Sequence, residues 1–389
     1  QRQLSKLSSI SQETFSGIHI IKAFNNENNI SNYFYKSCKK YSIKNLQLAK
    51  IDAVFFPLII ILIGASTILT IYVGGIESYK GNISTGNIAE FIIYINMLAW
   101  PVASVGWVTS LIQRSAASQK RINDFLQETP EIYNNPKTFK ITNNIEFKNV
   151  SLTYDDTQIE ALNNINFKIN QGKTLGIFGE TGSGKTTIAN LICRLYDVTK
   201  GEILFNKKNI KDLNLSQLRL SIGYVPQDGY LFSGSIKDNI SFSDDKFNEQ
   251  KIIDAAKQAE IWEEINLFKN GINTIVGERG IQLSGGQRQR LAIARTFYKN
   301  PDLFIFDDCL SAVDANKEKS ILSYLKKRTK NKTTIIISHR INTIKDADLI
   351  IVLKKGKIIS KGTHEDLLKK KDFYYKINNS QSNNNLINI

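Results

Sequence analysis

Two long uncharged stretches constrain this chain more than any other feature of its sequence. They cover residues 53–74 and 91–112, and neither contains Asp, Glu, Lys or Arg. At about 1.5 Å of rise per residue, a helix of either length crosses the ~30 Å hydrocarbon core of a bilayer. The sequence therefore predicts two membrane helices, at about residues 52–75 and 88–112. The alternative is a buried hairpin in a soluble protein, which two such stretches make the weaker interpretation.

The charges around these stretches predict their orientation in a lipid bilayer. The segment 77–87 between them is short and nearly neutral, whereas basic residues flank both outer ends. Since basic loops stay on the cytoplasmic side, both outer flanks are expected in the cytoplasm and the short segment outside the cell. The flanking basic residues are Lys39, Lys40, Lys44, Lys50, Arg114, Lys120 and Arg121.

Outside the two stretches the chain is polar and rich in lysine. Its 51 Lys and Arg against 36 Asp and Glu give a net charge of +15. Such a charge suits nucleic acid, an anionic membrane surface or an anionic ligand, so it does not choose between them. The three cysteines lack C-x-x-C spacing and the three histidines are far apart in sequence. These patterns argue for a reducing compartment and against a metal cage.

Composition shifts divide the chain into four parts. The first residue is Gln1, and helical spacing of apolar residues begins at once, which indicates a fragment or processed form. We expect a membrane region at 1–127, a proline-containing linker at 128–143, a soluble domain at 144–377 and a disordered tail at 378–389. The tail expectation rests on its low content of apolar residues.

The segment TLGIFGETGSGKTT, residues 174–187, predicts a phosphate-binding site. A buried strand leads into a glycine-rich turn with the spacing G-x-x-x-x-G-K-T, and a helix follows. The glycines let backbone N–H groups surround phosphate, Lys185 places a cation on the β- and γ-phosphates, and Thr186 offers a hydroxyl to Mg²⁺. The candidate ATP-binding residues are Gly179, Glu180, Thr181, Gly182, Ser183, Gly184, Lys185, Thr186 and Thr187.

A second buried strand ends in two acids. The apolar residues 303–306 lead directly to Asp307 and Asp308. A strand that delivers a carboxylate to the edge of a nucleotide site suits Mg²⁺ binding, and Asp307 is the candidate ligand beside Thr186. A solvated strand end is the alternative, and only the neighbouring phosphate loop makes this pattern informative.

The motif LSGGQ narrows the class of protein. Ser284, Gly285, Gly286 and Gln287 precede or open a helix whose N-terminus and serine hydroxyl can hold an anion. With this motif the sequence resembles the ATP-binding-cassette (ABC) family, and further markers follow in the expected places. They are Tyr154, Gln227 in YVPQD, Asp314 in SAVD and His339 in TTIIISHR.

The resemblance implies a fold and a set of roles. The fold is a helical membrane-domain fragment followed by an α/β P-loop nucleotide-binding domain with a helical subdomain. Two cassettes close head to tail, so each ATP lies between Lys185 of one chain and Ser284 of the other. His339 contacts the γ-phosphate and holds the attacking water, Gln227 touches Mg²⁺ or water, and Tyr154 stacks on adenine. The alternatives are a structural histidine, a surface glutamine and an ordinary strand tyrosine.

The membrane part resembles exporters in which six helices precede one cassette. The two predicted spans correspond to the fifth and sixth of these helices. Residues 24–34 are then the coupling segment that touches a cassette, with a plain helix–loop–helix as the alternative. Because two helices cannot enclose a substrate pathway, we expect the chain to bind nucleotide without transporting by itself. Whether the exported molecule is a small molecule or a lipid is left open.

One departure from the family pattern concerns the residue after the Mg²⁺ acid. The family usually has Glu there, whereas this chain has Asp308. A carboxylate withdrawn by ~1 Å can slow a reaction by about 10²-fold. The chain therefore resembles the degenerate-site subunit of bacterial heterodimeric multidrug exporters, in which its intact LSGGQ completes the active site of a second half-transporter. A homodimer is the alternative.

Three classes of function remain at this point. The leading one is an ABC-type transporter ATPase of a multidrug or lipid export translocase in the cell membrane. A soluble cassette ATPase acting on nucleic acid explains the charge but not residues 53–74, so we expect no nucleic-acid partner. A homodimeric lipid or peptide exporter is the variant of the first class. A regulatory cassette that barely hydrolyses ATP is favoured by Asp308 and disfavoured by the other intact site residues: Lys185, Gln227, Ser284 and His339.

Overall fold

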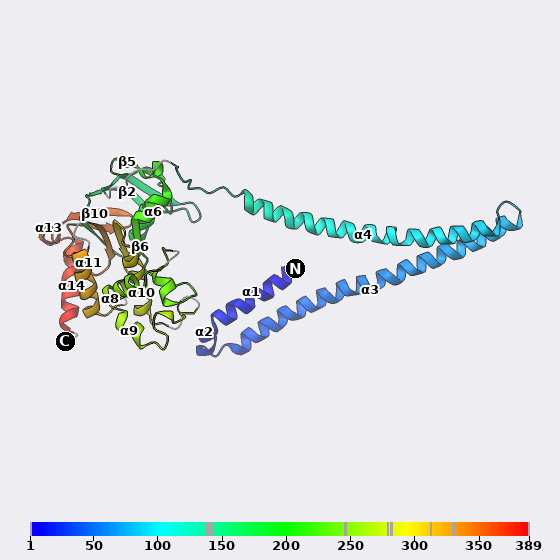
Figure 1. Ribbon diagram of the computed structural model, residues 1–389, viewed down its shortest axis with the longest axis horizontal. Helices are drawn as coiled ribbons and strands as arrows, with labels where there is room; N and C mark the ends of the chain where they lie inside the picture. Colours follow the sequence, from blue (N-terminus) through cyan, green and yellow to red (C-terminus); the bar gives the residue numbers. More distant parts are fainter. Residues whose placement is uncertain are drawn as a thin grey trace. The chain divides into compact units, whose positions relative to one another are not determined.

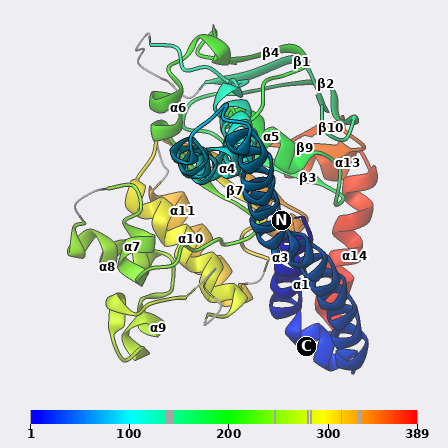
Figure 2. The same cartoon turned by 90° about the vertical axis from the view of Figure 1, so that its right-hand side faces the viewer.

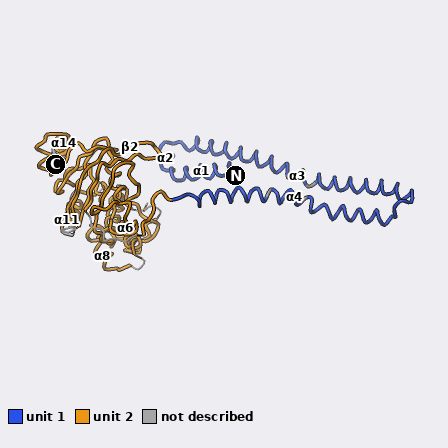
Figure 3. The backbone as a smooth tube through the Cα atoms, turned by 90° about the horizontal axis from the view of Figure 1, so that it is seen from above, with its two compact units in different colours: residues 1–129 blue, residues 130–389 orange. Residues whose placement is uncertain are grey.

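The computed structural model describes residues 2–136, 144–244, 247–277, 280, 283–311, 313–328 and 332–387. Two compact units make up the chain, residues 1–129 and residues 130–389 (Figure 3). Part of the expected linker, residues 137–143, lies outside the described residues.

The described residues of the first unit form helices joined by short turns and contain no strand. Its two long helices, α3 and α4, run side by side and are joined by the short segment 80–84 (Figure 1). Both are long and apolar enough to cross a membrane, and the apolar windows of both are exposed rather than buried in protein. The helices of this unit are α1 (Arg2–Ser16), α2 (Ile18–Ala23), α3 (Glu27–Tyr79) and α4 (Thr85–Gln127).

Small and polar residues close the hairpin between α3 and α4. A Cβ on Gly74 would lie 2.9 Å from the side chain of Ile88, so glycine allows the two helices to approach closely. Near the end of α3, Glu77 accepts hydrogen bonds from Lys80 and Asn82 of the connecting segment. Ser84 then begins α4 with a capping box. The predicted pair of apolar helices is therefore present as a continuous helical hairpin, whose helices extend well beyond the predicted spans.

The second unit contains two sheets in its described residues. An antiparallel sheet has the order β2-β1-β4-β5, and a larger sheet has the order β10-β9-β3-β8-β7-β6. In the larger sheet all neighbours are parallel except β10, which pairs with β9 in antiparallel fashion. The strands are β1 (Ile145–Tyr154), β2 (Ile159–Ile169), β3 (Thr174–Gly179), β4 (Lys200–Phe205), β5 (Lys208–Asn209), β6 (Ile222–Val225), β7 (Leu303–Asp307), β8 (Thr333–Ser338), β9 (Leu349–Lys354) and β10 (Lys357–Gly362).

Three buried apolar clusters stabilise the second unit. Because successive side chains of a strand point to opposite faces of the sheet, neighbouring residues belong to different clusters. In β7, Leu303 and Ile305 face the cluster shared with the antiparallel sheet, whereas Phe304 and Phe306 face the cluster formed with α7–α11. In β9, Ile350 and Val352 face a third cluster, formed with the C-terminal helices. The parallel strands thus read as continuous apolar runs because both faces of the sheet are covered.

Some helices cover the faces of the larger sheet, and others form a separate group. Figure 2 shows α7, α8 and α9 on the side of the unit away from β1 and β2, and in Figure 1 α8 and α9 likewise lie away from β2. The helices are α5 (Lys185–Ile192), α6 (Leu215–Ser221), α7 (Ile236–Ile240), α8 (Glu249–Gln258), α9 (Trp262–Leu267), α10 (Gly285–Lys299), α11 (Ala315–Arg328), α12 (Ile341–Ile344), α13 (His364–Lys369) and α14 (Phe373–Ile387), with short 3₁₀ turns at Ile210–Asp212 and Gly271–Asn273.

The tail differs from the sequence expectation. Residues 378–389 are predicted to be disordered, but α14 includes residues 378–387, and residues 388–389 lie outside the described residues. The physical reason is tertiary. Tyr374 is buried, Ile377 packs against the third cluster, and Gln381 hydrogen-bonds the chain around residues 339–341. These contacts supply the stabilisation that the polar composition of the segment does not.

Candidate functional site

The phosphate loop lies between β3 and α5. Gly179 ends β3, and a Cβ there would lie 2.3 Å from the carbonyl oxygen of Leu353. Gly184 has φ +96° and begins α5, and its Cβ would meet the carbonyl of Ala161 at 2.6 Å. Only glycine fits at these two positions, because the first has no space and the second has both a left-handed backbone and no space. Glu180, Thr181 and Gly182 lie exposed on the loop, and the first N–H groups of α5 follow.

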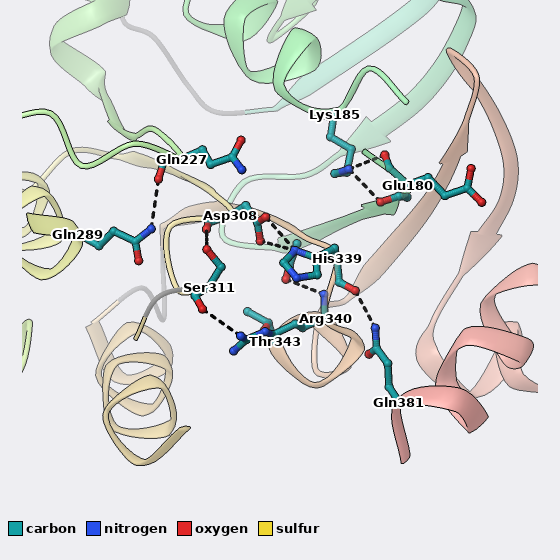
Figure 4. Close-up of polar contacts among 12 residues, drawn as sticks. Glu180, Lys185, Gln227, Gln289, Asp308, Ser311, His339, Arg340, Thr343 and Gln381 are labelled. Carbon is teal, nitrogen blue, oxygen red and sulfur yellow. Dashed lines mark hydrogen bonds and ion pairs between the residues drawn. The ribbon is translucent and has the colours of Figure 1, made fainter. Parts of the chain in front are cut away.

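Lys185 lies over this loop. Its Nζ donates hydrogen bonds to the carbonyls of Gly179 and Glu180, at 2.8 and 2.7 Å (Figure 4). Partial burial lowers the pKa of the ammonium, and the negative charges of Asp308 and Asp307 oppose that shift. A cation is thus held beside a set of backbone N–H donors, which is the arrangement that binds a polyphosphate.

The predicted Mg²⁺ ligands are brought together. Asp307, the last residue of β7, is almost fully buried and shares a side-chain hydrogen bond with Thr186 of α5. The hydroxyl of Tyr224 in β6 donates to the Asp307 carboxylate at 3.3 Å. Burial raises the pKa of Asp307, against the effect of these two hydrogen bonds. Hydroxyl and carboxylate oxygens are donors that Mg²⁺ prefers, and a divalent cation would stabilise the buried charge, so these residues fit the ion.

Asp308 and His339 are in direct contact. His339 Nδ1 lies 2.8 Å and 3.0 Å from the two carboxylate oxygens of Asp308 (Figure 4). The Asp308 side chain is 15% exposed, whereas the imidazole is 50% exposed. Asp308 adopts φ +47°, a left-handed conformation that Asp tolerates, and its N–H donates to Ile337 O at 2.9 Å. The turn therefore directs the carboxylate toward the end of β8, where His339 follows.

Parallel pairing explains why these groups meet. β8 lies between β3 and β7 in the sheet, and all three run in the same direction. Their carboxyl ends therefore place the phosphate loop, His339 and the two aspartates at one edge, where ligands of such sheets bind.

Arg340 ties the histidine loop to the segment after Asp308. Its guanidinium donates to Ser311 O at 2.9 Å and to Glu318 at 3.3 Å. Glu318 also accepts from Thr343 at 2.6 Å. Asp314, singled out from the SAVD marker, accepts a hydrogen bond from the Lys317 N–H and so caps α11. The sequence analysis missed Arg340, and its position beside His339 was the only local signal.

Tyr154 and Gln227 lie in different settings. The Tyr154 hydroxyl is 3.1 Å from Thr187 Oγ1, and its ring meets Tyr196 edge to face. The tyrosine is thereby attached to the helix that follows the phosphate loop. Gln227 is exposed, and its backbone carbonyl accepts a hydrogen bond from Gln289 at 3.2 Å. None of its hydrogen bonds among the described residues joins it to Asp307 or Thr186.

The LSGGQ residues begin helix α10 in the helical group. Ser284 is the N-cap, and Ser284 and Gln287 form a capping box. Gly285 and Gly286 occupy the first turn, where the N–H groups lack partners within the helix. The serine O–H stays available as a donor because the capping box uses the oxygen as an acceptor. None of the described hydrogen bonds of these residues reaches the phosphate loop.

Glu264 of α9 supports this helix start, and the sequence analysis did not find it. Its carboxylate accepts from Gln287 at 2.9 Å, from Arg290 at 2.6 Å and from Lys317 at 2.5 Å. Although burial alone would raise the pKa of Glu264, the hydrogen bonds of Lys317 and Gln287 and the charge of Arg290 lower it. One carboxylate thus joins α9, α10 and α11. Nothing local distinguishes Glu264 from Glu263 in the sequence.

Comparison with known proteins agrees with this division into two units. The family described as ABC transporter matches residues 162–311, and the family described as ABC transporter transmembrane region matches residues 1–102. A bacterial Atm1-family ABC exporter with ATP bound aligns with a TM-score of 0.86 and 30% sequence identity, covering 98% of this chain and 68% of that chain.

Curated relatives show the same likeness. The chain is 39% identical over 376 residues to the multidrug resistance-like ATP-binding protein MdlA of Buchnera aphidicola subsp. Schizaphis graminum, covering 96% of this chain and 65% of that protein. It is 36% identical over 384 residues to the ATP-dependent lipid A-core flippase of Syntrophus aciditrophicus, covering 98% of this chain and 64% of that protein. The chain thus spans slightly less than two thirds of these relatives.

The chain belongs to the ABC transporter family. It combines part of the helical transmembrane region with the α/β nucleotide-binding domain, so the predicted family and fold class are confirmed. It is a membrane protein whose nucleotide-binding domain lies in the cytoplasm, as in this family. The assignment to a degenerate-site subunit stays a prediction.

Proposed function

We propose that this chain is the ATP-binding and ATP-hydrolysing part of an ABC export translocase. The observation that carries the proposal is the meeting of a cationic phosphate loop, a buried carboxylate with a hydroxyl partner, and an aspartate–histidine pair at one edge of the sheet. If the glycine-rich turn were only structural, there would be no reason for these three groups to lie beside it. The names of the relatives, a multidrug resistance-like protein and a lipid A-core flippase, support a small molecule or lipid as the exported substrate.

Each residue of the site has a separate role in ATP hydrolysis. Lys185 and the N–H groups at the start of α5 bind the β- and γ-phosphates. Thr186 and Asp307 would hold Mg²⁺, with Gln227 as a further contact, and the ion supplies charge neutralisation on the phosphate oxygens when bound. Asp308 orients the attacking water and accepts its proton, while His339 contacts the γ-phosphate and is itself oriented by Asp308. Tyr154 stacks on adenine.

We further propose that two cassettes act together. Ser284 and the N–H groups of Gly285 and Gly286 contact the ATP held by the phosphate loop of the partner, and Gln287 supports this helix start. The partner is a second half-transporter. We favour a heterodimer because Asp308 stands where the family usually has Glu. A homodimer with a competent aspartate, and a regulatory cassette that binds ATP with little hydrolysis, are the alternatives.

The proposed coupling segment is residues 24–34. It begins at the turn between α2 and α3, and the side chain of Phe24 is 79% exposed there. A large apolar side chain exposed at a helix–helix turn suits contact with another protein surface. We propose that this segment meets a cassette and passes on its nucleotide-dependent movement.

The test compares Lys185→Ala with the wild-type chain in lipid nanodiscs, with and without candidate half-transporter partners. Mg²⁺-dependent phosphate release at this chain's own site should fall by at least about 10²-fold, because the substitution removes the cation aimed at the transferred phosphate. The control is Lys211→Ala on the exposed surface. Release at the wild-type rate by Lys185→Ala would overturn the proposal. Nucleotide binding without release above the Lys185→Ala level would instead favour the regulatory cassette.

A further inference from the structure

The C-terminal helix α14 packs against β3, the strand that leads into the phosphate loop. Tyr374 in the first turn of α14 is 1% exposed, and its ring meets Phe178 edge to face with centroids 5.5 Å apart. The Tyr374 hydroxyl lies 2.8 Å from His364 Nδ1 of α13. Phe178 directly precedes Gly179 in β3. The start of α14 is therefore fixed to the strand that carries the phosphate loop.

Two turns farther along, α14 reaches the histidine loop. Gln381 follows Tyr374 by seven residues, so both side chains lie on one face of the helix, with Ile377 between them. Gln381 Nε2 donates to the carbonyl of His339 at 2.8 Å (Figure 4). Gln381 Oε1 accepts from the N–H of Ile341 at 3.0 Å. The two bonds together define the orientation of the amide, because one atom must donate and the other must accept.

These bonds act on the backbone on both sides of Arg340. The imidazole of His339 points to Asp308, while the carbonyl of the same residue is bound by Gln381. Arg340 holds the loop from another direction through Ser311 and Glu318. A histidine that is half exposed and follows the end of a strand has little packing to hold it, so its position depends on these polar contacts.

We infer that Gln381 is a positioning residue for His339, through which the C-terminal helix controls the rate of hydrolysis. The inference rests on the proposed function for its kinetic consequence, and on the two hydrogen bonds for its structural one. Loss of the amide frees the His339 backbone, and displacement of a catalytic group by ~1 Å lowers a rate by as much as about 10²-fold. Nucleotide affinity is unaffected because Gln381 does not contact the phosphate loop.

The experiment uses Gln381→Leu and Gln381→Glu, with Asn379→Leu and Asn379→Asp as matched controls on the exposed face of the same helix. For Gln381→Leu we expect kcat to fall about tenfold at unchanged KM, and hydrogen exchange at the Ile341 amide to become faster. Gln381→Glu keeps the acceptor but loses the donor, so kcat falls while the Ile341 amide stays protected. The Asn379 variants should match the wild type in both measurements. Thermal unfolding and binding of a fluorescent ATP analogue show that each variant is folded and loaded.

Two results would overturn the inference. One is a wild-type kcat in Gln381→Leu, and the other is unchanged exchange at Ile341 in that variant. A fall in melting temperature with no change in kcat of the folded protein counts as the first result. Should the wild-type chain release no more phosphate than Lys185→Ala, the proposed function fails, and exchange at Ile341 alone then decides whether Gln381 holds the loop.

Discussion

The phosphate-loop edge and the start of α10 are built in different ways. At the first, Lys185, Asp307 and His339 come from three segments far apart in sequence and meet at the ends of adjacent parallel strands. At the second, Ser284 to Gln287 form one local motif at a helix start, supported from behind by Glu264. We propose that the first region holds and attacks a phosphate. The second offers a serine hydroxyl and helix N–H groups as donors, which is why we propose that it contacts a nucleotide held by the partner chain.

Among the effects that test this comparison, the largest is expected for Ser284. In a dimer of marked chains, Ser284→Ala should lower phosphate release at the partner's site by about 10-fold to 10²-fold, because it removes a donor aimed at the partner's ATP. Nucleotide binding at its own phosphate loop should stay unchanged. Single-turnover measurements with one site disabled through Lys185→Ala separate the two sites. Loss confined to the site of the mutated chain itself would contradict the head-to-tail arrangement.

Asp308→Glu tests whether the phosphate-loop edge of this chain is limited by its short acid. The longer side chain should restore the reach of the carboxylate and raise turnover at this chain's own site by about one to two orders of magnitude. Rapid-quench phosphate release measures it, with Asp302→Glu as a surface control. If turnover does not rise, and the unmodified chain hydrolyses ATP briskly as a homodimer, the heterodimer proposal is wrong.

The smallest effect concerns the support of α10. Glu264→Gln leaves Arg290, whose side chain is only 6% exposed, without its carboxylate partner. Loss of a hydrogen bond to a charged group costs about 1.5–3 kcal/mol, so thermal unfolding of the soluble unit should occur at lower temperature. Glu263→Gln on the same helix is the control. Equal melting temperatures for the two variants would show that this carboxylate does not stabilise the helix start.

The same variant has a defined pH dependence. The pKa of Glu264 is lowered from its ordinary value of 4.5, so the folded state binds the proton less tightly than the unfolded chain does. Its stabilisation is therefore complete above the unfolded pKa and is lost as the pH falls through the lowered folded value. Melting temperatures measured across this acid range should fall less steeply for Glu264→Gln than for the wild type.

The contrast between the two regions also explains what the sequence could predict. The phosphate loop, the two apolar spans and the strands before Asp307 and His339 are local patterns with a definite period or spacing. Their meeting was predictable because parallel strands end at one edge. Glu264 and Gln381 act through contacts with residues 23 and 42 positions away. Such long-range contacts leave no local pattern in the sequence. The polar composition of the C-terminal segment is typical of a disordered chain, and only the contacts of α14 with the rest of the unit show why it is helical.

The continuous helix α3 also has a mechanical consequence. At about 1.5 Å per residue, its 53 residues form a rod of about 80 Å, of which the bilayer core needs about 30 Å. With the uncharged stretch 53–74 in the bilayer, residues 27–52 would form roughly 40 Å of helix outside the lipid, on the side that begins at Glu27 next to the turn at Phe24. A tilt of about 5° within the membrane would move that end sideways by about 3.5 Å, as a lever converts a small rotation into a larger displacement. A displacement of the turn would thus reach the lipid-embedded segment through a helix that is continuous in the structure, Pro57 included.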